Sequence, residues 1–324
     1  PALIQRFLSQ YGTPNFIRMP SIQDGYELTL LLWHGVQATQ GFDIQSSDYI
    51  LSFGSGVLDG WGSPVYWFKA HSRLRDNRGT LVQIEPRLSN TAAKSDDWVP
   101  VYPGTEGALA LGLAHVIIKE SLYNKDFIDS YTTGFDRFER AVLDGYSPNI
   151  VSELTGVEGA RITKLAREFA RAQKPIAVAG RGQGSTPGGI RESMAVHALN
   201  ALVGNINQKG GFWAVPPPDY IEWPEPELDS IATSGTQTAR IDGAGSNPYP
   251  QTKYLASRIP ELINSAAVSP LQILFVVESN PAYTLPGTDA VISAMSKIPV
   301  KVSFSSYMDE TALMCDYILP NHIY

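Results

Sequence analysis

Cysteine is almost absent from this sequence, because Cys315 is the only one among 324 residues. A single thiol excludes an intrachain disulfide, and it also excludes a cysteine-rich zinc site or an iron–sulfur cluster built from this chain alone. Long apolar runs are missing too: the best stretch, residues 108–118, is interrupted by Gly112 and His115 and falls short of the ~18 residues that a bilayer span requires. We therefore expect no direct membrane span.

Basic clusters are also lacking. The 25 Lys and Arg residues are outnumbered by 32 Asp and Glu residues, and the formal net charge of −7 is spread along the chain. Proteins that bind nucleic acid neutralise phosphates with clustered cations, so nucleic acid is not an expected partner. A single small anion remains compatible with this charge, because backbone N–H groups and one or two arginines can hold it. The chain starts at Pro1 and ends just after a strand-like run, which indicates a fragment of a longer protein.

Short apolar runs alternate with amphipathic stretches along the sequence, a pattern typical of an α/β fold with a parallel sheet. Strands are expected at residues 49–53, 81–84, 98–102, 176–179, 272–277, 300–304 and 317–319. Helices are expected at residues 25–34, 106–120, 135–143, 158–172, 189–202, 253–264 and 289–297. Ligands of such folds bind at the carboxyl ends of the strands, so the turns that follow strands are the first places to search for function.

A proline-rich stretch at residues 214–250 breaks this alternation. Prolines occupy positions 216–218, 224 and 226, and proline fixes φ and lacks an N–H group, so no regular element is expected there. The stretch is interpreted as a surface connector. An alternative is that Phe212, Trp213, Tyr220 and Trp223 dock a partner subunit or line a cofactor funnel.

The first motif with chemical potential is the turn Gly54-Ser55-Gly56, which follows an apolar strand. Glycines in such a turn let the backbone approach a ligand and expose N–H donors to an anion. A plain strand-ending turn explains the same residues equally well.

The second motif has two parts, Glu85-Pro86-Arg87 at the end of a strand and Pro103-Gly104-Thr105-Glu106 at the start of a helix. An acid at a strand end can accept a hydrogen bond from a ribose hydroxyl or a base N–H, and an arginine beside it can bind a phosphate bidentately. Glu106 could cap the helix, or it could accept the paired N–H donors of a guanine edge. The two roles are compatible.

These two segments, sixteen residues apart, resemble the DPR…PGTD signature of the molybdopterin oxidoreductases, the dimethyl-sulfoxide-reductase superfamily. The likeness covers most of the chain. Further short matches occur, in the family's order, at residues 48–56, 127–135, 155–170, 180–184, 203–211, 278–281 and 310–320. Each match is short, but together and in this order they are specific.

The resemblance implies an α/β fold of two Rossmann-like three-layer domains with mostly parallel sheets, which hold two molybdopterin guanine dinucleotides around molybdenum or tungsten. It assigns residues 1–19 and 251–324 to part of the first domain, residues 20–213 to the second, dinucleotide-binding domain, and residues 214–250 to the connector. Carried over residue by residue, it implies cofactor contacts from Gly54, Ser55, Glu85, Arg87, Glu106, Gly182, Gln183 and Asn280. The chain departs from the family at Gly56, where Asn is usual, and at Glu85 and Glu106, where the usual residue is Asp.

The metal-ligand position is a sharper departure. The family places Cys, selenocysteine, Ser or Asp near the start of the helix before the first strand, and counting back from Gly35 gives Ile22, which cannot bind a metal. Ser21 and Asp24 lie beside it and offer oxygen donors, so they mark the candidate metal-ligand region. Either residue is equally well explained as the N-cap of the helix.

Other residues carry less information. The five histidines show no pair at metal-ligand spacing, and ordinary core or surface roles are expected for them, as for Cys315. An aromatic loop at residues 60–68 could shield a cofactor or simply pack. In this loop the chain resembles the molybdopterin-like subunits of membrane menaquinone reductase complexes.

The leading hypothesis is a molybdopterin-family redox subunit of a respiratory complex that links a periplasmic electron donor to quinone. The expected partners are an iron–sulfur subunit and a membrane quinone-binding subunit, with cytochrome c as a further candidate, on the periplasmic side of the bacterial inner membrane. The alternative is a scaffold subunit that keeps the fold without metal or pterin. A nicotinamide dehydrogenase is disfavoured, because Gly180 to Gly184 reads G-x-G-x-G and the next helix starts only at Gly189.

Overall fold

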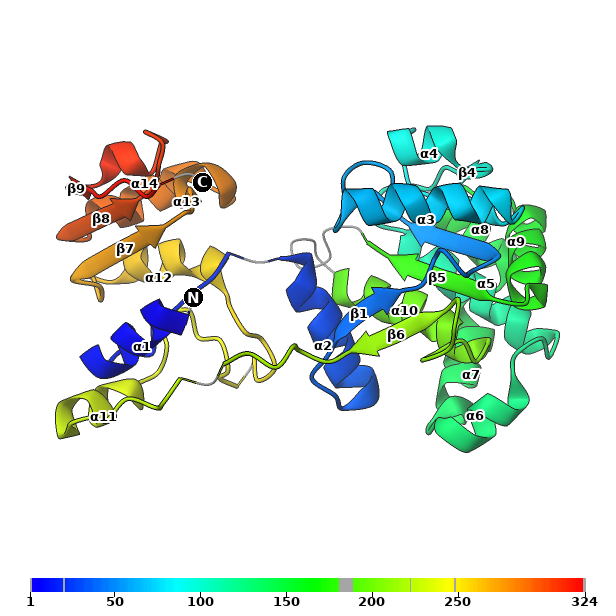
Figure 1. Cartoon of the computed structure of the whole chain (residues 1–324), viewed down its shortest axis with the longest axis horizontal. Coiled ribbons are helices and arrows are strands. Elements are labelled where there is room, and N and C mark those ends of the chain that lie inside the picture. Colours follow the sequence, from blue (N-terminus) through cyan, green and yellow to red (C-terminus); the bar gives the residue numbers. More distant parts are fainter. Residues whose placement is uncertain (1, 20, 181–188, 222, 248, 323–324) are drawn as a thin grey trace. The chain divides into compact units, whose positions relative to one another are not determined.

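The computed structural model describes residues 2–19, 21–180, 189–221, 223–247 and 249–322 (Figure 1). The chain divides into two compact units: residues 1–20 with 220–324 form unit 1, and residues 21–219 form unit 2. Each unit is described here by itself. No helix within the described ranges combines the length and apolarity that a bilayer crossing requires.

Unit 2 is built on a four-stranded sheet in the order β4-β3-β2-β5. Its strands are β2 (Tyr49–Phe53), β3 (Thr80–Ile84), β4 (Asp97–Val99) and β5 (Pro175–Ala179), and all three pairings are parallel. Phe53 lies opposite both Ile84 and Ala179, and Ile84 lies opposite Val99. The carboxyl ends of the four strands therefore form one edge.

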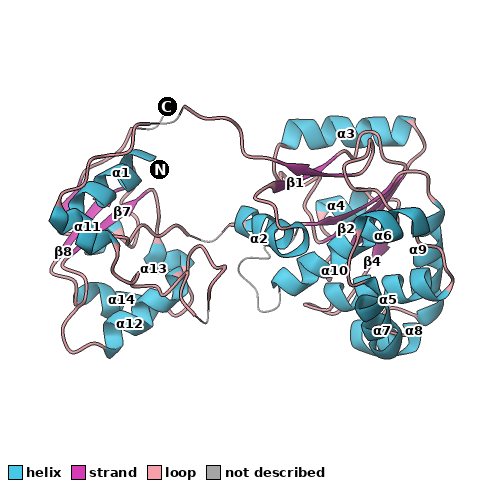
Figure 2. Ribbon diagram, turned by 90° about the horizontal axis from the view of Figure 1, so that it is seen from below, coloured by secondary structure: helices cyan, strands magenta, loops and turns pink. Residues whose placement is uncertain are grey.

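Both faces of this sheet are covered, as parallel sheets require. Leu51 and Phe53 point into a core shared with α5 (Glu106–Lys119), α8 (Pro148–Thr155), α9 (Gly159–Arg171) and α10 (Gly189–Leu202). Ile50 points the other way, toward α2 (Ile22–His34) and α3 (Pro64–Asp76). Figure 2 shows α3 on one side of the strands and α5 and α8 on the other. The alternation of apolar side chains along β2 thus produces three layers.

Smaller elements complete unit 2. The helices α4 (Asn90–Lys94), α6 (Lys125–Tyr131) and α7 (Phe135–Gly145) lie between the larger ones in sequence, and β1 (Thr39–Phe42) pairs antiparallel with β6 (Phe212–Val215). A side chain also completes the outer strand: the Asn200 amide accepts a hydrogen bond from the Ala177 N–H at 2.8 Å and donates to its carbonyl at 2.9 Å. Asn200 therefore satisfies backbone groups that no neighbouring strand can reach.

Unit 1 contains a second parallel sheet, in the order β7-β8-β9. Its strands are β7 (Ile273–Val277), β8 (Val300–Phe304) and β9 (Tyr317–Ile318). The helical elements are α1 (Ala2–Tyr11), α11 (Ser230–Thr236), η1 (Ala256–Arg258), α12 (Ile259–Ser265), α13 (Pro281–Thr284), α14 (Thr288–Ser296) and η2 (Ala312–Met314). Leu274 of β7 packs against residues of both α12 and α14. The expected mixed α/β fold with parallel sheets is confirmed.

Several sequence-based expectations about these elements are wrong. The strand expected at 98–102 ends at Val99, since Pro100 has no N–H group to continue the ladder. The helix expected from residue 253 starts as η1 at Ala256 and becomes α12 at Ile259, with Pro260 in its first turn. The helix expected from residue 25 begins at Ile22.

Two segments expected to be irregular contain regular elements. The aromatic loop at 60–68 turns into α3 at Pro64, because proline suits the first turn of a helix. The proline-rich stretch at 214–250 contains α11, which occupies a proline-free part of it and is capped by the Asp229 carboxylate. The first residues of the stretch, Ala214 and Val215, belong to β6.

Candidate functional site

The turn after β2 opens the candidate site at the carboxyl edge of the unit 2 sheet. Gly54 has a φ of 65°, a conformation that favours glycine, and its N–H donates to the Ile84 carbonyl at 2.9 Å. Ser55 is fully buried: its carbonyl accepts from Gln83 Nε2 at 3.2 Å, and its hydroxyl bonds to that of Ser52. The Gly54-Ser55-Gly56 turn is therefore fixed from below by two polar side chains of the sheet.

The end of β5 lies directly against this turn. A Cβ atom placed on Gly180 would stand 2.0 Å from the Ser55 Cβ, a distance that no real side chain tolerates. The preceding carbonyl, that of Ala179, accepts a hydrogen bond from the buried Tyr26 hydroxyl of α2. Glycine at position 180 is therefore required by close approach of the two strand ends.

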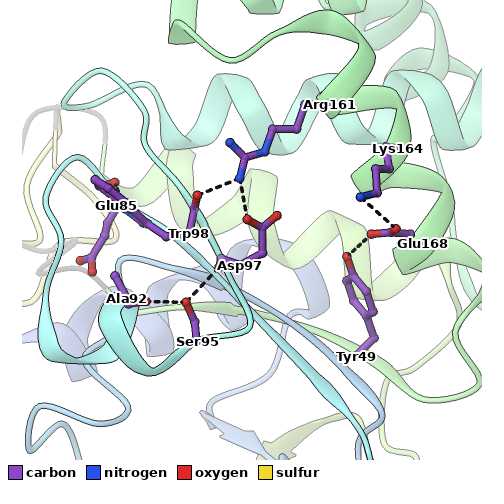
Figure 3. Close-up of polar contacts among 9 residues, drawn as sticks. All are labelled: Tyr49, Glu85, Ala92, Ser95, Asp97, Trp98, Arg161, Lys164 and Glu168. Atoms are coloured by element: carbon purple, nitrogen blue, oxygen red, sulfur yellow. Dashed lines mark hydrogen bonds and ion pairs between the residues drawn. The ribbon is translucent and has the colours of Figure 1, made fainter.

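Glu85 stands at the end of the next strand and is only 7% exposed. Its carboxylate accepts a hydrogen bond from the Ser89 hydroxyl. Its carbonyl accepts one from the Trp98 indole N–H at 3.1 Å, and Figure 3 draws both Glu85 and Trp98. Arg87, two residues further on, is exposed. An acceptor carboxylate and an exposed guanidinium thus lie at the same strand end, as the sequence indicates.

Glu106 is the first residue of α5 and is fully buried. The N-cap of this helix is Thr105, so Glu106 itself is not the cap. Glu106 lies in the first turn instead, where the helix dipole favours an anion. The neighbouring Gly107 lies against the first part of α10, because a Cβ on it would stand 3.2 Å from the Glu192 Cα. The first turns of α5 and α10 therefore lie close together, and Glu106 is buried at the start of α5.

A separate polar set in the figure anchors α9 to the sheet rather than forming a site. Arg161 donates to the Asp97 carboxylate at 2.6 Å and to the Trp98 carbonyl at 2.8 Å, and the Tyr49 hydroxyl donates to Glu168 at 3.0 Å (Figure 3). Burial and the neighbouring Glu168 carboxylate raise the pKa of Tyr49, so the phenol stays neutral. These contacts belong to the first residues of β2 and β4.

The candidate metal-ligand residues contact each other. The Ser21 N–H and hydroxyl both donate to Asp24 Oδ2, at 2.9 and 3.1 Å, at the start of α2. This is the hydrogen-bonding pattern of a helix cap, in which one polar side chain satisfies the first turn. The structure therefore supports the capping interpretation of these two residues, whereas Ile22 offers no donor atom.

The remaining predicted contacts are distributed as follows. Gly182 and Gln183 lie outside the described residues. Asn280 belongs to unit 1, where its amide donates to Glu310 at 2.6 Å and accepts from the Thr311 hydroxyl at 2.7 Å. It follows β7 and begins α13, so it too stands at the carboxyl end of a parallel strand.

A histidine pair was missed by the sequence analysis, which expected no paired histidines. His34 at the end of α2 and His197 in α10 place their Nε2 atoms 2.7 Å apart. Burial and the neighbouring His34 lower the pKa of His197 to about 3. No sequence signal could have found the pair, since its members are 163 residues apart. Within the described part of the chain, no group of three or more His, Cys, Asp or Glu side chains is placed to hold a metal ion.

The arrangement in unit 2 fits the nucleotide part of a pterin dinucleotide. A turn of small residues lets the backbone approach a diphosphate, and two carboxylates at neighbouring strand and helix ends suit ribose hydroxyls and base N–H groups. The fit does not extend to the metal, because the position expected to ligate it is Ile22 and the adjacent Ser21 and Asp24 bond to each other.

Comparison with known proteins supports the same chemistry. Residues 3–324 match the model of the family described as molybdopterin oxidoreductase. The chain is 32% identical over 323 residues to the menaquinone reductase, molybdopterin-binding-like subunit, of Nitratidesulfovibrio vulgaris, covering 98% of this chain and 42% of that protein. It is 26% identical to the molybdopterin-containing subunit of arsenate respiratory reductase of Chrysiogenes arsenatis, over 95% of this chain and 40% of that protein.

The fold has a solved counterpart. Acetylene hydratase from Pelobacter acetylenicus superposes with a TM-score of 0.75 at 19% identity, over 98% of this chain and 46% of the other. At that identity the likeness concerns the fold alone. The chain spans less than half the length of these relatives.

Proposed function

We propose, since this chain belongs to the molybdopterin oxidoreductase family, that it is the dinucleotide-binding portion of a redox subunit in a respiratory electron-transfer complex. The observation that carries the proposal is the shared carboxyl edge in unit 2, where the Gly54–Gly56 turn, Glu85 and Glu106 follow neighbouring strands. In an open parallel sheet this edge is where nucleotides bind.

The roles we assign follow from the chemistry of each group. The backbone at Gly54 and Ser55 approaches the diphosphate, with the Ser55 N–H as donor because the Gly54 N–H already donates to the Ile84 carbonyl, and the exposed Arg87 binds a phosphate oxygen. Glu85 accepts from a ribose hydroxyl, and Glu106 accepts from the guanine N–H donors. When bound, the metal–pterin group supplies the electron-transfer chemistry, and the polypeptide binds, orients and electrostatically tunes it.

Further cofactor contacts complete the proposal. We assign them to Gly182 and Gln183 and, in unit 1, to Asn280, so that two Rossmann-like domains hold two guanine dinucleotides. The domains are residues 20–213 and residues 1–19 with 251–324, joined by residues 214–250. Molybdenum and tungsten are both compatible with the family.

The proposed setting is a complex that passes electrons between a periplasmic donor and quinone. We assign an iron–sulfur subunit to it as a carrier of electrons to and from this subunit. A membrane subunit would bind the quinone, and cytochrome c is a candidate donor. The relative from N. vulgaris, described as a menaquinone reductase subunit, supports this setting.

A second candidate function is favoured by one observation, the capping contact between Ser21 and Asp24 beside Ile22. Without a protein ligand to the metal, the subunit would act as a scaffold that keeps the fold and assembles its partners.

The two candidates are separated by analysing the full-length protein purified natively. Molybdenum and tungsten are measured by elemental analysis, and pterin by its fluorescence after oxidation. The redox proposal expects stoichiometric pterin together with one of the two metals. If intact protein contains neither pterin nor metal, the redox proposal is contradicted. If it contains stoichiometric pterin and stoichiometric metal, the scaffold function is excluded.

A further inference from the structure

The hydrogen bonds among Leu58, Asp59 and Thr91, which we call the Asp59–Thr91 brace, join the loop after the Gly54–Gly56 turn to the start of α4. The Thr91 hydroxyl donates to Asp59 Oδ2 at 2.9 Å, and the Thr91 N–H donates to the same oxygen at 3.2 Å. The Leu58 N–H donates to the Thr91 hydroxyl at 3.0 Å. Thr91 is fully buried, whereas Asp59 is exposed, so water is excluded only from the Thr91 side of these bonds.

The direction of each bond is fixed by chemistry. A hydroxyl has one proton and can accept as well as donate. The Leu58 N–H can only donate, so the Thr91 proton is committed to Asp59. Although partial burial acts to raise the pKa of Asp59, hydrogen bonds from Thr91, Asn90 and Ser89 outweigh it and hold this pKa below its ordinary value. Asp59 is therefore an anion at neutral pH.

The same logic continues from α4 to Glu85. Ser89 is the N-cap of α4, and its hydroxyl accepts from the Ala92 N–H at 3.1 Å. The Ser89 hydroxyl donates its single proton to the Glu85 carboxylate, and Asp59 lies near enough to share this donor. One carboxylate oxygen of Glu85 thus accepts from Ser89, and this contact sets the orientation of the other oxygen.

We infer that Asp59 is a positioning residue for Glu85, an inference that rests on the proposed function. Asp59 holds Thr91 and so fixes the first turn of α4. The position of this turn fixes the Ser89 hydroxyl, and that hydroxyl orients the Glu85 carboxylate, which is assigned to the ribose. The brace also ties the two nucleotide-facing loops, those after β2 and β3, into one rim. Neither Asp59 nor Thr91 needs to touch the ligand for this role.

The test uses natively purified full-length protein and the variants Asp59→Ala, Thr91→Val and Thr91→Ser. Thr91→Val keeps the side-chain shape and removes the hydroxyl, whereas Thr91→Ser restores it. The matched control is Asp144→Ala, an exposed acid in the last turn of α7. One readout is hydrogen exchange of the peptide covering residues 89–94, and the other is GMP released by acid per folded chain, after gel filtration.

We expect Asp59→Ala and Thr91→Val to speed exchange in this peptide by about tenfold, the scale set by loss of a hydrogen bond to a charged group. Both variants should lower retained GMP toward one equivalent per chain, because Glu85 serves one of the two proposed dinucleotides. Thr91→Ser and Asp144→Ala should match the wild type. A purely structural role would lower the melting temperature without changing GMP per folded chain.

The outcomes keep the two proposals apart. If the wild-type protein releases no GMP, the proposed function is contradicted, and the role of Asp59 in positioning Glu85 for a ligand is contradicted with it. Equal exchange in the wild type and Thr91→Val overturns the brace itself, whatever the GMP content. Faster exchange with unchanged GMP overturns the positioning role and leaves the proposed function standing.

Discussion

Acid should destabilise unit 2 through His197, and this prediction can be worked out from the structure. His197 lies in α10 and is only 3% exposed. Its ring packs edge-to-face against that of Phe212, with the ring centroids 4.5 Å apart, and its Nε2 lies 2.7 Å from that of His34. Burial, with a contribution from His34, lowers its pKa to about 3. In the unfolded chain a histidine has a pKa of about 6.5.

The sign follows from proton uptake. Below pH 6.5 the unfolded chain binds a proton at His197 and the folded chain does not, so stability falls as pH falls. As the pH falls from 7.5 to 5.5, protonation of His197 stabilises the unfolded state. The free energy of unfolding falls by about 1.4 kcal/mol from this residue alone. His197→Phe removes the titrating group and keeps an aromatic ring of similar size.

The assay is urea unfolding followed by tryptophan fluorescence at the two pH values. The signal reports mainly on unit 2, which contains every tryptophan except Trp223. In His197→Phe the loss of stability between pH 7.5 and pH 5.5 should be smaller than in the wild type by about 1.4 kcal/mol. The exposed His322 provides the control, since His322→Asn should leave the difference unchanged. Equal pH dependence in the wild type and His197→Phe would refute the reasoning.

Three other substitutions test separate features. Gly180→Ala should destabilise unit 2 by about 1–3 kcal/mol through overpacking at the turn after β2, whereas Gly145→Ala, in α7 with nothing within 4 Å of the added carbon, should not; equal urea midpoints would contradict this. Asn200→Ala leaves the Ala177 N–H and carbonyl of β5 without their partner and should cost about 2 kcal/mol or more, so an unchanged free energy of unfolding would refute the edge-completing role. Asp24→Ala should lower stability by about 1 kcal/mol as a lost cap and leave the metal content of native protein unchanged, and a loss of metal instead would identify Asp24 as a ligand.

The parts of the fold that the sequence predicted are those set by local periodicity. The strand at 300–304 and the helix at 189–202 were predicted with the bounds observed, because a short apolar run and a longer stretch of helix-forming residues that begins at a glycine are signals within one element. The short strands β1 and β6 were missed, since each is four residues long and is defined by its partner 170 residues away.

The candidate site divides in the same way. The places of Glu85 at a strand end and of Glu106 at a helix start could be predicted, because turn chemistry and helix starts are local signals. The contact of Gly180 with Ser55, the His34–His197 pair and the Asp59–Thr91 brace could not, because each depends on how distant segments pack. The resemblance to a family added order and spacing, but it could not show that Ser21 and Asp24 bond to each other.

Binding of a guanine dinucleotide at the carboxyl edge of the unit 2 sheet is decided by the guanine nucleotide content of natively purified full-length protein, in the wild type and in Glu106→Ala. Acid hydrolysis releases GMP from a bound guanine dinucleotide, and circular dichroism confirms that both proteins are folded. We expect two equivalents of GMP per chain in the wild type and a loss of about one of them in Glu106→Ala, because the buried carboxylate at one of the two proposed sites no longer accepts the guanine N–H donors. The same GMP content in both proteins, or none in the wild type, would contradict this binding.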